Sequence, residues 1–91
     1  MGDDRLLGDS DADLLDGGDG KDFLAGGTGF DILKGELGDD RLFGGDDADF
    51  LEGGDGGDFL AGGEGNDTVI GGSGNDEFQW MDDGRDLSYW W

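Results

Sequence analysis

Residues 17–34 read GGDGKDFLA followed by GGTGFDILK, which are two successive copies of one nine-residue unit. The unit has the form G-G-x-G-x-D-x-U-x, where U is an apolar residue. Further full copies occupy residues 53–61, 62–70 and 71–79. Partial copies, in which Asp or Glu replaces a glycine, occupy residues 8–16, 35–43 and 44–52, and the chain begins inside another copy. Self-similarity at a fixed nine-residue period predicts a repeat architecture.

Two positions of the unit keep their character in all nine copies. The sixth position is always aspartate: Asp4, Asp13, Asp22, Asp31, Asp40, Asp49, Asp58, Asp67 and Asp76. The eighth position is always apolar: Leu6, Leu15, Leu24, Leu33, Leu42, Leu51, Leu60, Val69 and Phe78. The glycines before the aspartate are typical of a turn, since glycine accepts positive φ, and the last three residues suit a short strand with its middle side chain inward.

The partial copies depart from the turn pattern to different degrees. Aspartate tolerates the left-handed backbone region better than most residues. Asp9, Asp11 and Asp47 are therefore mild departures from glycine, whereas Glu36 fits least well.

This arrangement resembles the RTX (repeats-in-toxin) family of secreted bacterial proteins, and the resemblance covers residues 2–79. It implies an all-β fold, a right-handed parallel β-roll or solenoid, in which two units make one coil. Units n and n + 2 then stack about 4.8 Å apart, as neighbouring parallel strands do. We expect residues 1–79 to form the roll and residues 80–91 to form an aromatic cap.

The resemblance also implies calcium ions between the stacked turns, held by the sixth-position aspartates and by carbonyl oxygens of the turn glycines. Calcium takes six to eight oxygen ligands, which one turn alone cannot supply. Asp4, Asp22, Asp40, Asp58 and Asp76 would stack on one edge and Asp13, Asp31, Asp49 and Asp67 on the other, which gives four and three sites, about seven in total. The glycines expected to contribute carbonyl oxygens are Gly18, Gly20, Gly27, Gly29, Gly45, Gly54, Gly56, Gly63, Gly65, Gly72 and Gly74.

Composition excludes several function classes. The net charge of −20 opposes binding to nucleic acids and acidic membranes. The sequence has no cysteine and no histidine, which excludes disulfides, cysteine zinc sites and histidine-activated nucleophiles. Its apolar runs are too short to cross a membrane. These features favour a non-enzymatic module that does not bind nucleic acid or insert into a membrane, and the resemblance implies calcium ions as its partners.

The same composition predicts that calcium folds the chain. High net charge with low hydrophobicity is typical of disorder, because little apolar burial opposes the chain entropy. Bound cations would reverse this, so the free energy of calcium binding would appear as folding free energy. The resemblance then implies a secreted module, disordered in the calcium-poor cytosol, that supports type I secretion and extracellular folding of a larger protein.

An alternative function is calcium-dependent binding, adhesion or self-assembly through the outward seventh and ninth positions. One face carries Leu14, Ile32, Phe50 and Thr68 beside Asp16, Lys34, Glu52 and Ile70. The other carries Arg5, Phe23, Arg41, Phe59 and Glu77 beside Leu7, Ala25, Phe43, Ala61 and Gln79, an alternation that permits cation–π stacking. The stripe Leu14, Ile32 and Phe50 is a candidate surface for self-association or for docking to a parent domain, although large side chains also pack this way on small sheets.

The last twelve residues lack the glycine pairs and hold all three tryptophans. A stacked roll leaves an open end that needs a cap, and an aromatic segment would provide one. The alternative is a binding site, since Trp and Tyr also suit ligand contacts.

Overall fold

The computed structural model describes residues 3–65, 67–79 and, for the backbone only, 87–89. Each strand has three residues and, up to Gln79, occupies the seventh to ninth positions of a unit, as the sequence predicts. The strands are β1 (Arg5–Leu7), β2 (Leu14–Asp16), β3 (Phe23–Ala25), β4 (Ile32–Lys34), β5 (Arg41–Phe43), β6 (Phe50–Glu52), β7 (Phe59–Ala61), β8 (Thr68–Ile70), β9 (Glu77–Gln79) and β10 (Leu87–Tyr89). The described residues contain no helix, and therefore none long and apolar enough to span a membrane.

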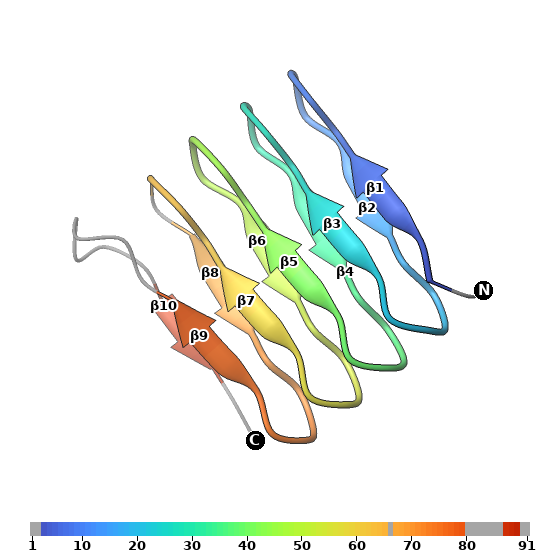
Figure 1. Cartoon of the computed structure of the whole chain (residues 1–91). Coiled ribbons are helices and arrows are strands. Elements are labelled where there is room, and N and C mark those ends of the chain that lie inside the picture. Colours follow the sequence, from blue (N-terminus) through green and yellow to red (C-terminus); the bar gives the residue numbers. More distant parts are fainter. Residues whose placement is uncertain (1–2, 66, 80–86, 90–91) are drawn as a thin grey trace.

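The strands form two parallel sheets that face each other (Figure 1). Sheet A has the order β1-β3-β5-β7-β9, and sheet B has the order β10-β8-β6-β4-β2. Successive strands of a sheet are eighteen residues apart up to β9, as in the pairing of Leu24 with Leu42. Two units therefore make one coil, and the expected all-β parallel solenoid is confirmed, with about four coils.

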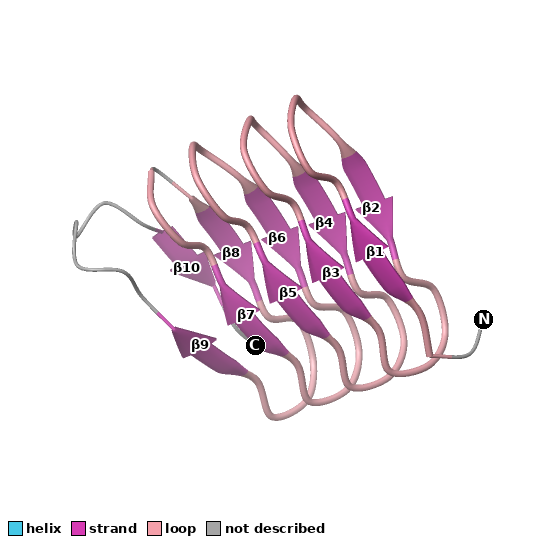
Figure 2. Ribbon diagram, turned by 45° about the horizontal axis from the view of Figure 1, so that its top comes forward, coloured by secondary structure: helices cyan, strands magenta, loops and turns pink. Residues whose placement is uncertain are grey.

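The core is a single stack of eighth-position side chains between the sheets. Because successive side chains of a strand point to opposite faces, the middle residue of each strand turns inward. The buried members are Leu15, Leu24, Leu33, Leu42, Leu51, Leu60 and Val69, with Leu6 and Phe78 packed against them more openly. The result is a slab of 31 × 27 × 14 Å whose two long edges are built from turns (Figure 2).

The turns need glycine at their second and fourth positions for two reasons. The backbone φ is positive at both, including at the replacements Asp9, Asp11, Glu36 and Asp47, where it lies between 73° and 78°. Space is also short, since a Cβ placed on Gly65 would lie 2.6 Å from the carbonyl oxygen of Asp47 in the preceding turn of the stack. Asp9 and Asp11 lie in the first turn of their edge, so only Glu36 and Asp47 replace glycine between two stacked turns.

Strand β10 lies beyond the last nonapeptide. It pairs in parallel with β8, with Leu87 opposite Thr68, a separation of nineteen residues instead of eighteen. Sheet B therefore continues one strand past the point where the sequence pattern ends. The other residues of the expected cap, 80–86 and 90–91, lie outside the described part of the chain.

Candidate calcium sites

The sixth-position aspartates form two columns, one along each edge of the slab. Each aspartate directly precedes a strand, so the parallel pairing of the strands brings aspartates of successive coils into line. The columns hold the residues that the sequence analysis grouped together: Asp4, Asp22, Asp40, Asp58 and Asp76 on the first edge, and Asp13, Asp31, Asp49 and Asp67 on the second. Six of the nine are buried, although each carries a carboxylate.

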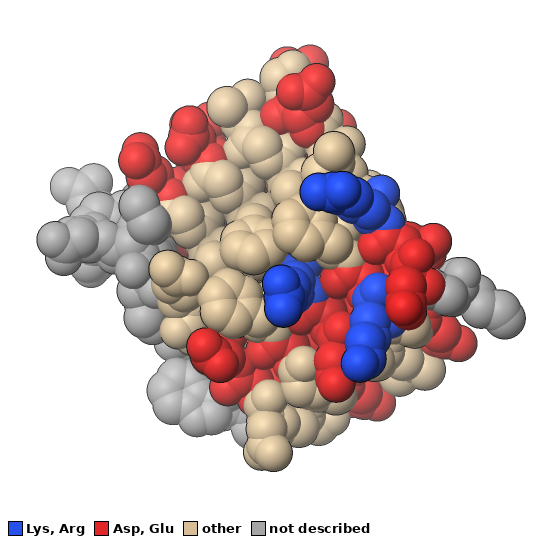
Figure 3. All heavy atoms as spheres, in the orientation of Figure 1, with Lys and Arg blue, Asp and Glu red and all other residues tan. Residues whose placement is uncertain are grey.

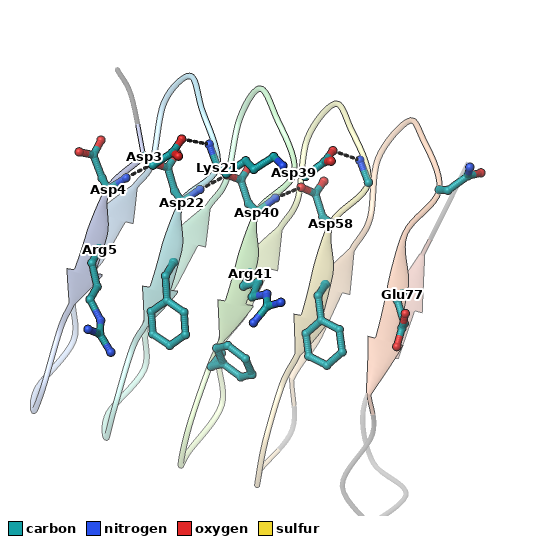
Figure 4. A pocket seen from close by; sticks show the side chains of 15 residues that line it. Asp3, Asp4, Arg5, Lys21, Asp22, Asp39, Asp40, Arg41, Asp58 and Glu77 are labelled. Carbon is teal, nitrogen blue, oxygen red and sulfur yellow. Dashed lines mark hydrogen bonds between the residues drawn. The ribbon is translucent and has the colours of Figure 1, made fainter.

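One oxygen of seven of the nine carboxylates has a structural role. The backbone N–H of an aspartate donates to Oδ1 of the aspartate eighteen residues later, as from Asp22 to Asp40 at 2.8 Å (Figure 4). The same bond, at 2.8 or 2.9 Å, joins Asp4 to Asp22, Asp13 to Asp31, Asp31 to Asp49, Asp40 to Asp58, Asp49 to Asp67 and Asp58 to Asp76. These bonds fix each side chain inside its turn and mark seven steps between stacked turns.

The second carboxylate oxygen is buried without a hydrogen-bond partner. This applies to Oδ2 of Asp13, Asp22, Asp31, Asp40, Asp49, Asp58 and Asp76. Leaving a buried polar group unsatisfied costs about 1–3 kcal/mol, and more when the group is charged. Native proteins rarely tolerate such a group without a bound ion or another explanation. The columns therefore present a regular series of oxygens that a cation would satisfy.

The first glycine of each unit makes room for this oxygen. A Cβ placed on Gly26 would lie 2.5 Å from Oδ2 of Asp31 and 2.8 Å from the carbonyl oxygen of Gly44 in the next stacked turn. Gly35 and Gly53 have the same surroundings. These glycines do not have positive φ, so they are needed for space and not for backbone freedom. An aspartate oxygen and a carbonyl oxygen thus face the same point between two turns.

The sequence analysis did not include these first-position glycines among the site residues. The signal was present, because the first position is glycine in every unit that the chain contains from its start: Gly8, Gly17, Gly26, Gly35, Gly44, Gly53, Gly62 and Gly71. The second and fourth positions, which were included, admit acidic replacements.

The carbonyl groups of the second and fourth positions point along the stack. The carbonyl oxygens of Gly27 and Gly20 are the atoms nearest to where a Cβ of Gly45 and Gly38 would lie. Several second-position carbonyls already accept one hydrogen bond, as from the N–H of Glu64 to Gly45 at 3.0 Å. A carbonyl oxygen has a second lone pair, so these groups keep the capacity to contact a cation.

Burial raises the pKa of several column carboxyls far above the ordinary value of 3.8. The pKa of Asp40 rises to about 7, and those of Asp49 and Asp58 rise to about 8. Loss of hydration is the largest cause in each case, and neighbouring carboxylates of the same column raise these pKa values further, against backbone hydrogen bonds that lower them. The pKa values of Asp31 and Asp76 are raised for the same leading reason. Each column thus favours a proton or a cation beside its carboxylates.

The candidate donors are oxygen atoms from two stacked turns. Within the described ranges, no three Asp, Glu, His or Cys side chains converge on one point. A cation between these turns would therefore need backbone carbonyls beside at most two carboxylates. Such hard, all-oxygen sets suit calcium better than the transition metals that prefer nitrogen or sulfur.

Comparison with known families agrees with this donor chemistry. The model of the RTX calcium-binding nonapeptide repeat matches the chain in four copies, over residues 1–33, 16–51, 25–60 and 52–78. The chain therefore belongs to the RTX calcium-binding nonapeptide repeat family, and it is a calcium-binding module. No curated protein matches the chain at a significant level.

Proposed function

We propose that the chain is a calcium-dependent folding module that binds about seven ions, one at each step between stacked turns. The ligands would be the sixth-position aspartates, through their second carboxylate oxygens, together with carbonyl oxygens of the turn glycines. The carbonyl groups of the first-position glycines, such as Gly44, join the proposed set because they face the same points. The observation that carries the proposal is the repeated buried Oδ2 without a hydrogen-bond partner, as in Asp31, Asp40 and Asp49.

Charge supports the dependence of folding on calcium. The chain has a net charge of −20, and its fold buries two columns of carboxylates. Self-repulsion and loss of hydration both oppose that state when the carboxylates carry no counterion. Seven calcium ions would reduce the net charge to −6, and their binding free energy would become folding free energy.

The place of such a module is outside the cell. RTX repeats occur in secreted bacterial proteins, and extracellular calcium sites have dissociation constants of about 10⁻⁴–10⁻³ M. We infer that the chain stays unfolded where calcium is scarce, passes through a type I secretion channel, and folds on arrival as part of a larger protein. In this role it has no catalytic residues.

Residues 1–79 would form the roll and residues 80–91 its cap. The pairing of β10 with β8 favours this division, because it adds a strand from the terminal segment to the end of sheet B. The alternative function, self-assembly or docking through Leu14, Ile32 and Phe50, is favoured by their alignment across β2, β4 and β6 on the outer face of sheet B.

The test is far-UV circular dichroism of the chain, titrated from chelator to about 10 mM calcium, with magnesium as the control ion. We expect a steep gain of β signal with calcium alone. Asp49→Asn should raise the calcium midpoint by about tenfold, equivalent to about 1.4 kcal/mol. Asp46→Asn is the matched control, because Asp46 lies exposed in the same turn and should leave the midpoint nearly unchanged. Native-like β signal in chelator above pH 8, where the column carboxyls are ionised, or equal effects of the two substitutions, would reject the proposal.

A further inference from the structure

The outer face of sheet A combines aromatic and basic side chains in an otherwise acidic molecule. Arg5, Lys21 and Arg41 are three of the five basic residues of the chain, and all line one shallow groove on this face. Figure 3 shows basic side chains gathered beside an uncharged surface. In Figure 4, Arg5, Arg41 and Glu77 lie along the strands, while Asp4, Asp22, Asp40 and Asp58 follow the turn edge.

Three phenylalanines form the centre of this face. The ring of Phe43 lies 5.2 Å from that of Phe23 and 5.7 Å from that of Phe59, measured between centroids. Ala25 and Ala61 flank Phe43 in the ninth-position column and leave room for its ring. The guanidinium of Arg5 lies over the ring of Phe23 at 5.3 Å, which confirms the predicted cation–π contact. The three rings remain only half-buried, so a large apolar surface faces outward.

The order of residues across this face is nearly symmetric about β5. From β1 to β9 the seventh-position column reads Arg5, Phe23, Arg41, Phe59 and Glu77. The ninth-position column reads Leu7, Ala25, Phe43, Ala61 and Gln79. A twofold axis that lies parallel to the strands and passes over β5 would reverse the strand order of a second copy. It would set Phe23 against Phe59 of the second copy, alanine against alanine, and Arg5 against Glu77.

We propose that two copies of the folded chain form a symmetric dimer through the outer faces of their A sheets. Arg5 of each copy then pairs with Glu77 of the second copy, at both ends of the interface. The phenylalanines meet in the middle, and the same patch serves both copies, as a twofold interface requires. Such an interface has an apolar centre and a polar rim, the usual anatomy of a specific contact.

Arg41 of the two copies would approach each other near the axis. Each Arg41 lies between Phe23 and Phe59 in the strand register, and Asp39 and Asp40 line the same groove. Asp39, an exposed carboxylate, is the group of the same groove that would offset the like charges of the two Arg41 side chains.

The strands of sheet A alone do not make a standard interface. Five strands of three residues span roughly 19 by 10 Å, so the flanking turns must contribute to reach about 800 Å² on each partner. The net charge of −20 on each copy opposes association. This part of the inference rests on the proposed function, because seven bound calcium ions would lower that charge to −6. We therefore expect the dimer only in calcium.

The outer face of sheet B is a weaker candidate for a symmetric contact. Its ninth-position column reads Asp16, Lys34, Glu52 and Ile70. The carboxylate of Asp16 lies near Glu36 and is the largest cause of the raised pKa of Glu36. Acidic groups therefore border one side of the apolar stripe, and the described side chains of β8 at its far end, Thr68 and Ile70, carry no basic group to match them.

The test is sedimentation equilibrium of the full chain in calcium, with circular dichroism of each sample to report folding. We expect Glu77→Arg and Arg5→Glu each to weaken the dimer by at least about tenfold, since each sets like charges against each other. The double variant Arg5→Glu/Glu77→Arg restores opposite charges and should recover most of the affinity. Both side chains are exposed, so folding should not change.

Ile32→Thr/Phe50→Thr on sheet B is the matched control and should leave the dimer intact. A folded chain that remains monomeric, a double variant without recovery, or loss of the dimer only in the sheet B variant would each overturn the inference. A folded monomer in calcium would leave the proposed function standing, whereas a chain that fails to fold in calcium would overturn both.

Discussion

At the scale of the residue, the two oxygens of a column aspartate that follows another coil, such as Asp40, have separate roles. Oδ1 accepts a backbone N–H from the preceding coil, and Oδ2 turns towards the first glycine of its own unit. The first role needs only an acceptor, which asparagine also provides. The second places a charge in a buried position, where a cation is the favourable complement. The aspartate is therefore required for its charge, and the glycine beside it for the space that it leaves.

Gly53→Ala tests that requirement for space. A Cβ at residue 53 would lie 2.5 Å from Oδ2 of Asp58 and 2.8 Å from the carbonyl oxygen of Gly71. Either oxygen must move, and both belong to the proposed site. Overpacking of this kind costs about 1–3 kcal/mol, so we expect the free energy of unfolding in calcium to fall by that amount. Chemical denaturation at fixed calcium measures the change.

Gly57→Ala is the control from the same turn. Its nearest contact would be the carbonyl oxygen of Asn75 at 3.0 Å, and its φ is not positive. We expect a clearly smaller loss of stability and an unchanged calcium midpoint. Equal losses in the two variants would mean that the space beside Asp58 has no special role.

At the scale of the element, each column of carboxyls should make the metal-free chain sensitive to pH. The folded pKa values of Asp40, Asp49 and Asp58 are about 7, 8 and 8, against an ordinary value of 3.8. Protonation therefore stabilises the metal-free fold. The contribution of protonation to the free energy of unfolding is complete below pH 3.8. It is lost as the pH rises through 7 to 8. In chelator, we expect β signal to increase as the pH falls from 8 towards 4, followed by circular dichroism.

The triple variant Asp40→Asn/Asp49→Asn/Asp58→Asn cannot take up these protons. Its β signal in chelator should change less with pH than that of the parent chain. A parent chain that loses β signal on acidification, or an unchanged pH response in the variant, would contradict the assignment of the raised pKa values to these carboxyls.

Strand positions followed from the sequence because one local rule repeats nine times. The glycines set each turn, the three residues after the aspartate form each strand, and the eighteen-residue stacking aligns the columns. Two features of the fold could not be predicted from this rule. The first is β10, which pairs with a strand nineteen residues earlier and is not preceded by the glycine pattern of a repeat unit. The contact of Phe43 with both Phe23 and Phe59 depends on alanine at its lateral neighbours, which is a relation between strands and not within a unit.

The candidate site was predictable to a similar extent. The alignment of the aspartates in two columns was expected from the repeat, whereas the resemblance to the RTX family implied their role as ligands and that of the carbonyls of the second and fourth positions. The first-position glycine was missed because its φ is ordinary, so its role appears only when the side chain of the aspartate is placed against it.

At the scale of the whole molecule, a solenoid with identical steps should bind calcium in proportion to its length. Each coil touches only its neighbours, so its stability is a sum of units and of interfaces between them. Tandem duplication of residues 53–70 adds one coil built from two full units. It creates one new step in each aspartate column, so the expected number of bound ions rises from seven to nine. Native mass spectrometry in calcium would count the ions directly.

The same duplication should also sharpen the calcium transition. Added steps couple more sites to one folding event, so the longer chain should fold over a narrower range of calcium concentration. The sequence 53–70 with Asp58→Asn and Asp67→Asn in the inserted copy provides the control, because it adds the coil without its carboxylates. An increase in bound ions that is the same for both insertions would show that the aspartate columns do not set the number of sites. Two additional ions in the parent insertion alone would tie each site to one step between stacked aspartates.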